Sequence, residues 1–86
     1  MASYRLVWKR SAEKELRDLP REAVTRIVRL AEALVDDPYP AGARGIVGSE
    51  RTYRLRSGDY RLVYTVERER LVIEVVRVAH RREVYR

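Results

Sequence analysis

The sequence predicts an α+β fold in which a helical hairpin packs on one face of an antiparallel sheet. Three observations predict it: an alternating N-terminal segment, two stretches with apolar residues at helical spacing, and three strand-like segments in the second half. The expected element order is strand, helix, helix, strand, strand, strand. With 86 residues, 45% of them hydrophobic, we expect one domain spanning residues 1–86.

The first half of the chain should form the first strand and the helical hairpin. Residues 4–8 alternate as a half-buried strand does. Ser11 is a suitable N-cap for a first helix that ends near Leu19, and Pro20 separates this helix from the next. The second helix is indicated by a set of apolar residues at helical spacing: Val24, Ile27, Val28, Ala31, Leu34 and Val35. The two prolines within residues 36–40 should end it.

The second half should form a glycine-containing loop and then a three-stranded meander. The predicted strands are residues 52–56, 60–66 and 71–78, joined by short polar turns. Strict alternation would place Glu74 and Arg77 on opposite faces, so the last strand contains a bulge or one of the two residues lies at the margin of the sheet. Residues from His80 to Arg86 lack strand alternation and are expected to form a short C-terminal helical turn or a tail.

The first hairpin of the meander carries the strongest functional signal. Its apolar residues alternate with basic ones, so one face can join the core while Arg54, Arg56 and Arg61 share the other. Three cations held close together destabilise the fold unless an anion binds, which favours a phosphate site. The alternative is a solvated face whose charges prevent aggregation.

Net charge narrows the class of partner. The formal charge is +6, and residues 44–86 carry eleven Lys or Arg against six Asp or Glu. A polyanion such as RNA or DNA is therefore the expected partner. No cysteine, membrane-length apolar run or metal-ligand cluster occurs in the sequence, so we expect a cytoplasmic protein with no metal, no cofactor and no membrane contact.

The C-terminal segment contains the residues best suited to move protons. His80 is the single histidine, and histidine is the side chain that normally titrates near neutral pH. It stands beside Arg81 and Arg82, while Tyr85 could stack on an unpaired base. The alternatives are an idle, exposed histidine and a tyrosine that anchors the terminus. Any chemistry should be metal-independent RNA cleavage, in which a 2'-hydroxyl attacks its own phosphate.

Over nearly its whole length the chain resembles the RelE/ParE superfamily of type II toxins, on the RelE side. The resemblance rests on six segments in this order: Tyr4-Arg-Leu-Val-Trp8, Ser11-Ala12 with Lys14-Glu-Leu16, Pro38 before the glycine loop, Tyr53-Arg-Leu-Arg56, Gly58-Asp-Tyr-Arg61 with Tyr64, and Arg77-Val-Ala-His-Arg-Arg-Glu-Val-Tyr85. It implies a ribosome-dependent mRNA endonuclease that leaves a 2',3'-cyclic phosphate and is silenced by a RelB-like antitoxin.

Residue roles follow from the resemblance at matching positions. It implies that Arg61 and Arg81 contact the reacting phosphate and that Tyr85 orients the base, with Arg54 and Arg56 on the RNA backbone. Arg77 and Arg82 are included among the RNA-binding residues. Several relatives carry lysine on the first hairpin strand, whereas both lysines here lie near the N-terminus, so we assign proton transfer to His80 as a hypothesis.

Two alternative functions share the same sequence features. One is a ParE-like inhibitor of DNA gyrase, which would bind its target without cutting nucleic acid. The other is a basic binding module without catalytic activity. A translation assay separates the endonuclease from both, and a supercoiling assay separates the gyrase inhibitor from the binding module.

Overall fold

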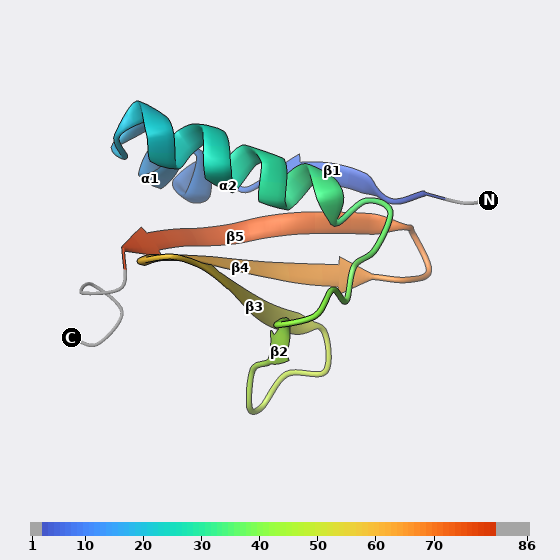
Figure 1. Cartoon of the computed structure of the whole chain (residues 1–86). Coiled ribbons are helices and arrows are strands. Elements are labelled where there is room, and N and C mark those ends of the chain that lie inside the picture. The colour runs from blue at the N-terminus through green and yellow to red at the C-terminus, as the bar shows by residue number, and fades with distance from the viewer. Residues whose placement is uncertain (1–2, 81–86) are drawn as a thin grey trace.

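A computed structural model describes residues 3–80 of the chain (Figure 1). Strand β1 (Arg5–Trp8) leads into helices α1 (Arg10–Arg17) and α2 (Arg21–Ala33). Four strands follow: β2 (Arg44–Gly45), β3 (Thr52–Ser57), β4 (Tyr60–Glu67) and β5 (Val72–His80). They form one five-stranded sheet in the order β1-β5-β4-β3-β2. The predicted α+β fold class is confirmed.

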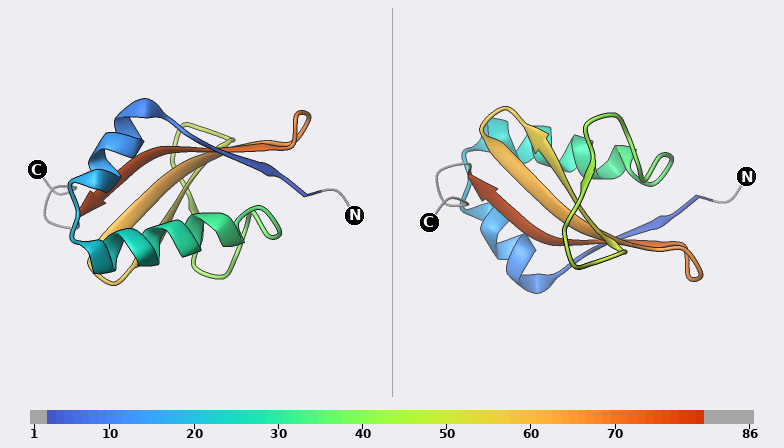
Figure 2. Two further views of the ribbon diagram at one scale, coloured as in Figure 1. Left: turned by 90° about the horizontal axis from the view of Figure 1, so that it is seen from above. Right: turned by 90° about the horizontal axis from the view of Figure 1, so that it is seen from below.

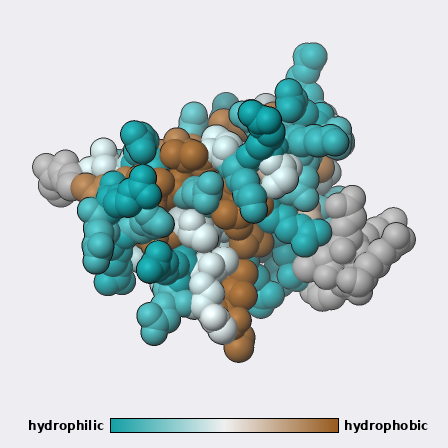
Figure 3. All heavy atoms as spheres, turned by 180° about the vertical axis from the view of Figure 1, so that it is seen from behind, coloured by the Kyte–Doolittle hydropathy of each residue, from teal (hydrophilic) through white to brown (hydrophobic). Residues whose placement is uncertain are grey.

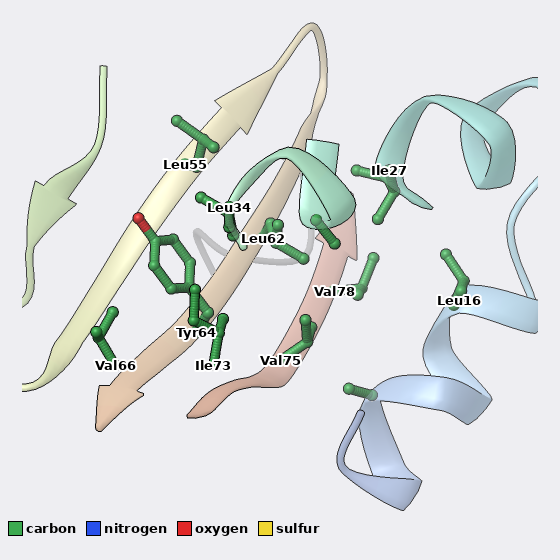
Figure 4. Packing of buried hydrophobic residues seen from close by; sticks show 12 residues of the cluster. Leu16, Ile27, Leu34, Leu55, Leu62, Tyr64, Val66, Ile73, Val75 and Val78 are labelled. Carbon is green, nitrogen blue, oxygen red and sulfur yellow. The ribbon is translucent and has the colours of Figure 1, made fainter. Parts of the chain in front are cut away.

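The two helices lie on the same side of the sheet, and within residues 3–80 no helix covers the other side (Figure 2). The core forms between the helices and the sheet, where Ile27, Leu34, Leu62, Ile73 and Val75 are fully buried (Figure 4). We call the uncovered side the open face. Neither helix within residues 3–80 is long and apolar enough to cross a membrane.

The structure adds two features to the predicted sheet. A two-residue strand, β2, pairs antiparallel with β3, where the sequence predicted only a loop. The first strand joins the far edge parallel to β5, so the sheet is mixed and not wholly antiparallel. Strands β1 and β5 can pair in parallel because the two helices and strands β2 to β4 lie between them in the chain, which leaves enough length for the chain to cross over.

The predicted N-cap of the first helix is wrong by two residues. Lys9 is the N-cap, and Ser11 lies within the first turn without capping it. The reason is that strand pairing continues into Lys9, whose N–H donates to the Val75 carbonyl at 2.9 Å. The chain therefore turns directly from strand pairing into the helix.

The hairpin of β3 and β4 has the predicted division of faces, and its turn is two residues long because Ser57 belongs to β3. Ser57 pairs with Tyr60, and Gly58 has a φ of 59° while Asp59 is not in the left-handed region. Glycine at the first central position with positive φ identifies a type II' turn, whose twist matches that of the two strands. The turn thus fixes which residues of β3 and β4 face each other.

Strand β5 contains a bulge, which was one of the two alternatives that the sequence left undecided. The register shifts between Val63 and Tyr64 of β4, so that Arg77 pairs with Val63 while Glu74 pairs with Thr65. Val63 and Thr65 are two apart and share a face, so Glu74 and Arg77 share it as well. The bulge therefore brings Arg77 onto the open face.

Strand β5 also extends further than predicted. It runs to His80, which is a strand residue and not the start of a tail. The predicted helical turn or tail beyond it, residues 81–86, lies outside the described residues.

A line of three tyrosines connects the core to the loop after α2. Tyr64 is fully buried, and its hydroxyl donates to the Pro38 carbonyl at 2.7 Å. Its ring stacks on Tyr53 at 5.9 Å, and Tyr53 meets Tyr39 edge-on at 5.1 Å. Burial, and to a smaller extent the neighbouring Tyr53, raises the pKa of Tyr64 to about 12. These contacts hold the loop against the sheet.

Candidate nucleic-acid interface

Four arginines from three adjacent strands lie on the open face. Arg44 of β2 pairs with Arg54 of β3, and Arg56 of β3 pairs with Arg61 of β4. Arg54 and Arg56 are two residues apart and therefore project to the same side. Paired positions in antiparallel strands bring Cβ atoms within about 5 Å of each other. We call this set, Arg44, Arg54, Arg56 and Arg61, the arginine row.

The members of the row differ in exposure. Arg44, Arg54 and Arg56 are exposed, whereas Arg61 retains only 5% of its accessible surface. On β4, Arg61 lies between Ala79 of β5 on one side and Arg56 of β3 on the other. The row therefore combines one fixed, buried cation with three exposed ones.

Two hollows of about 250 Å³ each flank the row. The first is lined by Gly42, Leu55 and all four arginines. The second has an apolar floor and rim, formed by Val63, Ala79, Ile46 and Val47, with Arg54, Arg61 and Arg77 around it. Arg54 and Arg61 line both hollows, so they stand between them. One ligand spanning both would pass over these two cations.

Apolar and charged groups are interleaved around the second hollow. Val47, in the loop between β2 and β3, is fully exposed. Figure 3 shows an apolar strip that runs down toward this loop between hydrophilic residues. A ligand with both charged and flat apolar parts, such as a single-stranded nucleic acid, matches such a surface.

A third hollow, of about 530 Å³, lies at the turn between β4 and β5 and has a different character. Its charged lining is balanced, with three glutamates and three arginines: Glu50, Glu67, Glu69, Arg51, Arg68 and Arg70. Glu67 lies 3.7 Å from Arg51 and 3.4 Å from Arg70. This internal pairing makes it a poor site for a polyanion, so the arginine row is the better candidate despite its smaller hollows.

Arg77 borders the second hollow and also contacts helix α1. Its Nε lies 3.7 Å from Oε2 of Glu15. The other carboxylate oxygen of Glu15 accepts a hydrogen bond from the Val78 N–H at 2.9 Å. One glutamate therefore holds both a side chain and the backbone at the end of β5.

His80 does not join the arginine row. It pairs with Tyr60, and its ring meets the Tyr60 ring edge-on at 5.2 Å. Alternation puts His80 and Val78 on the helix side, whereas Ala79 and its partner Arg61 lie on the open face. The side chains of His80 and Arg61 therefore leave the sheet in opposite directions.

The other predicted site residues divide into two groups. The structure brings Arg54, Arg56 and Arg61 to one face, as expected, and places Arg77, whose face the sequence did not settle, on the same side. Arg81, Arg82 and Tyr85 lie outside the described residues. Sequence reasoning missed Arg44, because a two-residue strand has no alternation to reveal it, and Glu15, whose partner is 63 residues away. Within residues 3–80, no group of three or more acidic or histidine side chains is placed to hold a metal ion.

Comparison with known families and proteins agrees with this geometry. The family model described as the ParE toxin of the type II toxin-antitoxin system, parDE, matches residues 6–85. Toxin RelG of Mycobacterium tuberculosis is 31% identical over 80 residues, which cover 88% of this chain and 88% of RelG.

Solved structures give the same match in three dimensions. RelE in the archaeal RelE-RelB complex from Pyrococcus horikoshii superposes with a TM-score of 0.82 and 27% identity, covering 92% of this chain and 96% of that one. The isolated RelE toxin of E. coli superposes with a TM-score of 0.80 and 27% identity, covering 98% and 92%.

Proposed function

The chain belongs to the RelE/ParE toxin family of type II toxin-antitoxin systems, and on that basis we propose that it is a ribosome-dependent mRNA endonuclease. The observation that carries the proposal is the arginine row, which offers four cations on one open sheet face to an RNA backbone. The similarity to RelE and RelG proteins supports the RNA-cleaving branch of the family.

The proposed reaction uses the RNA's own nucleophile. The 2'-hydroxyl oxygen attacks the adjacent phosphorus, the bond from phosphorus to the 5'-oxygen breaks, and a 2',3'-cyclic phosphate and a 5'-hydroxyl result. Negative charge accumulates on the phosphoryl oxygens in the transition state, where preorganised cations lower the barrier most. We assign this role to Arg61, whose buried position fixes it, together with Arg81. Arg54, Arg56, Arg77 and Arg82 would hold the backbone.

Proton transfer requires a further group, since arginine is protonated at any physiological pH. His80 and Tyr85 are the two candidates. Because His80 faces the helix side, it could act only on a substrate that reaches around the end of β5. The variant His80→Ala separates the candidates: lost cleavage assigns the base to His80, and unchanged cleavage leaves it to Tyr85.

We also propose a RelB-like antitoxin as the partner that silences the chain. The support is that RelE of Pyrococcus horikoshii was solved in complex with RelB. Its proposed targets, the ribosome and mRNA, would place the toxin in the cytoplasm.

The test is cleavage in a reconstituted translation reaction, with mRNA ends mapped by primer extension. We expect cuts that require ribosomes and that fall by about 10²-fold or more in Arg61→Ala. Arg21→Ala, which removes an exposed arginine at the start of α2, is the matched control and should cleave normally. Intact mRNA with active ribosomes would contradict the proposal.

The second candidate function is gyrase inhibition, which the ParE description of the matching family model favours. Such a protein would leave mRNA intact and block supercoiling of plasmid DNA by purified gyrase. The same preparation can be used for both assays, and inhibition of gyrase without RNA cleavage would replace the endonuclease assignment.

A further inference from the structure

We propose that Glu15 is a positioning residue, which holds the end of β5 in the place that the endonuclease site requires. This inference rests on the proposed function. At the edge of the sheet, β1 pairs with only the first part of β5. The register of β1 ends with Trp8 opposite Val75, and the Lys9 N–H makes the last contact of this edge with the Val75 carbonyl.

Beyond Val75, helix α1 takes the place of a neighbouring strand. Figure 2 shows α1 lying beside the arrowhead end of β5. A helix cannot continue the ladder of a sheet, so outward N–H groups of β5 must find other acceptors. Glu15 meets this need at Val78, whose N–H donates to Oε1 at 2.9 Å. A carboxylate acceptor makes this hydrogen bond stronger than a neutral one.

The second oxygen of the same carboxylate contacts an arginine of the open face. It lies 3.7 Å from Nε of Arg77, the arginine that the bulge turns to this side. Arg77 is half-exposed, with 55% of its side-chain surface accessible. An ion pair at that exposure is weak, so the hydrogen bond to the backbone is the stronger of the two contacts.

The position of Val78 in the chain gives this contact its functional consequence. Its neighbour Ala79 pairs with Arg61 on the open face. A shift of about 1 Å in catalytic geometry can cost about 10²-fold in rate. Glu15 touches neither RNA nor the row, and acts through β5.

Two variants separate the two contacts. Glu15→Gln keeps an oxygen that accepts from Val78 and removes the charge opposite Arg77, whereas Glu15→Ala removes both contacts. Glu13→Ala is the matched control, because Glu13 is exposed on the same helix. The hydrogen-exchange rate of the Val78 amide reports whether its hydrogen bond to Glu15 is intact. The cleavage rate at saturating ribosome concentration reports the catalytic step separately from ribosome binding.

We expect the Val78 amide of Glu15→Ala to exchange about tenfold faster. Its cleavage rate at saturation should fall by roughly 10- to 100-fold. Glu13→Ala should resemble the wild type in both measurements. Glu15→Gln should lie closer to the wild type than Glu15→Ala does, because its amide oxygen still accepts from Val78, although the hydrogen bond is weaker. An unchanged Val78 exchange rate in Glu15→Ala would overturn the proposal, as would faster exchange with unchanged cleavage. Failure of the proposed function looks different, because the wild-type protein itself would not cleave mRNA.

Discussion

Arg61 and Leu62 are neighbours on β4 and both are buried, yet their side chains lie on opposite faces of the sheet. One of these faces is apolar and the other is charged. Leu62 faces the helices and packs among apolar side chains that exclude water. Arg61 faces the open side, where it is buried while Arg54 and Arg56 of β3 stay exposed. We therefore expect the helix side of the sheet to contribute most of the folding free energy, and the charges on the open face to contribute to binding.

Substitutions at adjacent positions should reveal this difference most strongly. Leu62→Ala removes a fully buried side chain from the core and should cost about 2–5 kcal/mol of unfolding free energy. Val63→Ala, on the half-buried open face, should cost about 1 kcal/mol or less. Urea denaturation of the two variants measures both values. Equal costs would show that the open face is packed in solution as tightly as the core.

The buried tyrosine on the helix side should make stability depend on alkaline pH. Tyr64 has a pKa of about 12 in the folded protein, above its ordinary value of 10.0. The folded state therefore keeps this proton longer than the unfolded state, so the stabilisation is complete below pH 10 and is lost as the pH rises toward 12. The loss amounts to about 2–3 kcal/mol.

The control for this effect is Tyr64→Phe, which lacks the ionisable hydroxyl. The variant loses the hydrogen bond to the Pro38 carbonyl and should start about 1–2 kcal/mol less stable. Its unfolding free energy should then fall less steeply between pH 10 and pH 12 than that of the wild type, because the remaining tyrosines are common to both. Parallel pH profiles would show that Tyr64 ionises at an ordinary pKa.

On the open face, substitutions should change binding and leave stability nearly untouched. Arg54→Ala and Arg56→Ala remove exposed cations and should alter the unfolding free energy by about 0.5 kcal/mol or less. Each should lower the steepness with which ribosome binding weakens on a logarithmic salt scale by about one. Binding measured at several salt concentrations gives the slope. Arg21→Ala should keep the wild-type slope. If its slope also fell by about one, the arginine row would contribute no more to ribosome binding than any other exposed arginine.

The faces of the hairpin were predictable from the sequence because apolar and basic residues alternate along both strands. Tyr53, Leu55, Leu62 and Tyr64 all lie on the helix side, as their spacing indicates. The bulge in β5 was one of two alternatives that the sequence offered, because Glu74 and Arg77 are both polar but fall three positions apart. The alternation of residues along a strand is enough to predict which side chains face the core wherever one face of the strand is apolar.

What the sequence could not predict depends on contacts between distant segments. Arg44 joins the row only because β2 pairs with β3, and a two-residue strand leaves no periodic signal. The contact of Glu15 with Val78 is a tertiary one between a helix and a strand edge. The place of His80 within a strand was not predicted, because the last strand was expected to end at residue 78, whereas pairing with Tyr60 extends β5 to His80.

The smallest expected effect concerns charges at the margin of the open face, where Glu67 lies near Arg51 and Arg70. Both arginine side chains are more than 70% exposed, so solvent screens the pairs. Glu67→Gln should therefore change the unfolding free energy by about 0.5 kcal/mol or less, as measured by urea denaturation. It should also strengthen RNA binding slightly, because the net charge of this margin becomes more positive. A loss of more than 1 kcal/mol would mean that ion pairs also stabilise this side of the sheet, and the contrast between Arg61 and Leu62 would no longer describe the two faces.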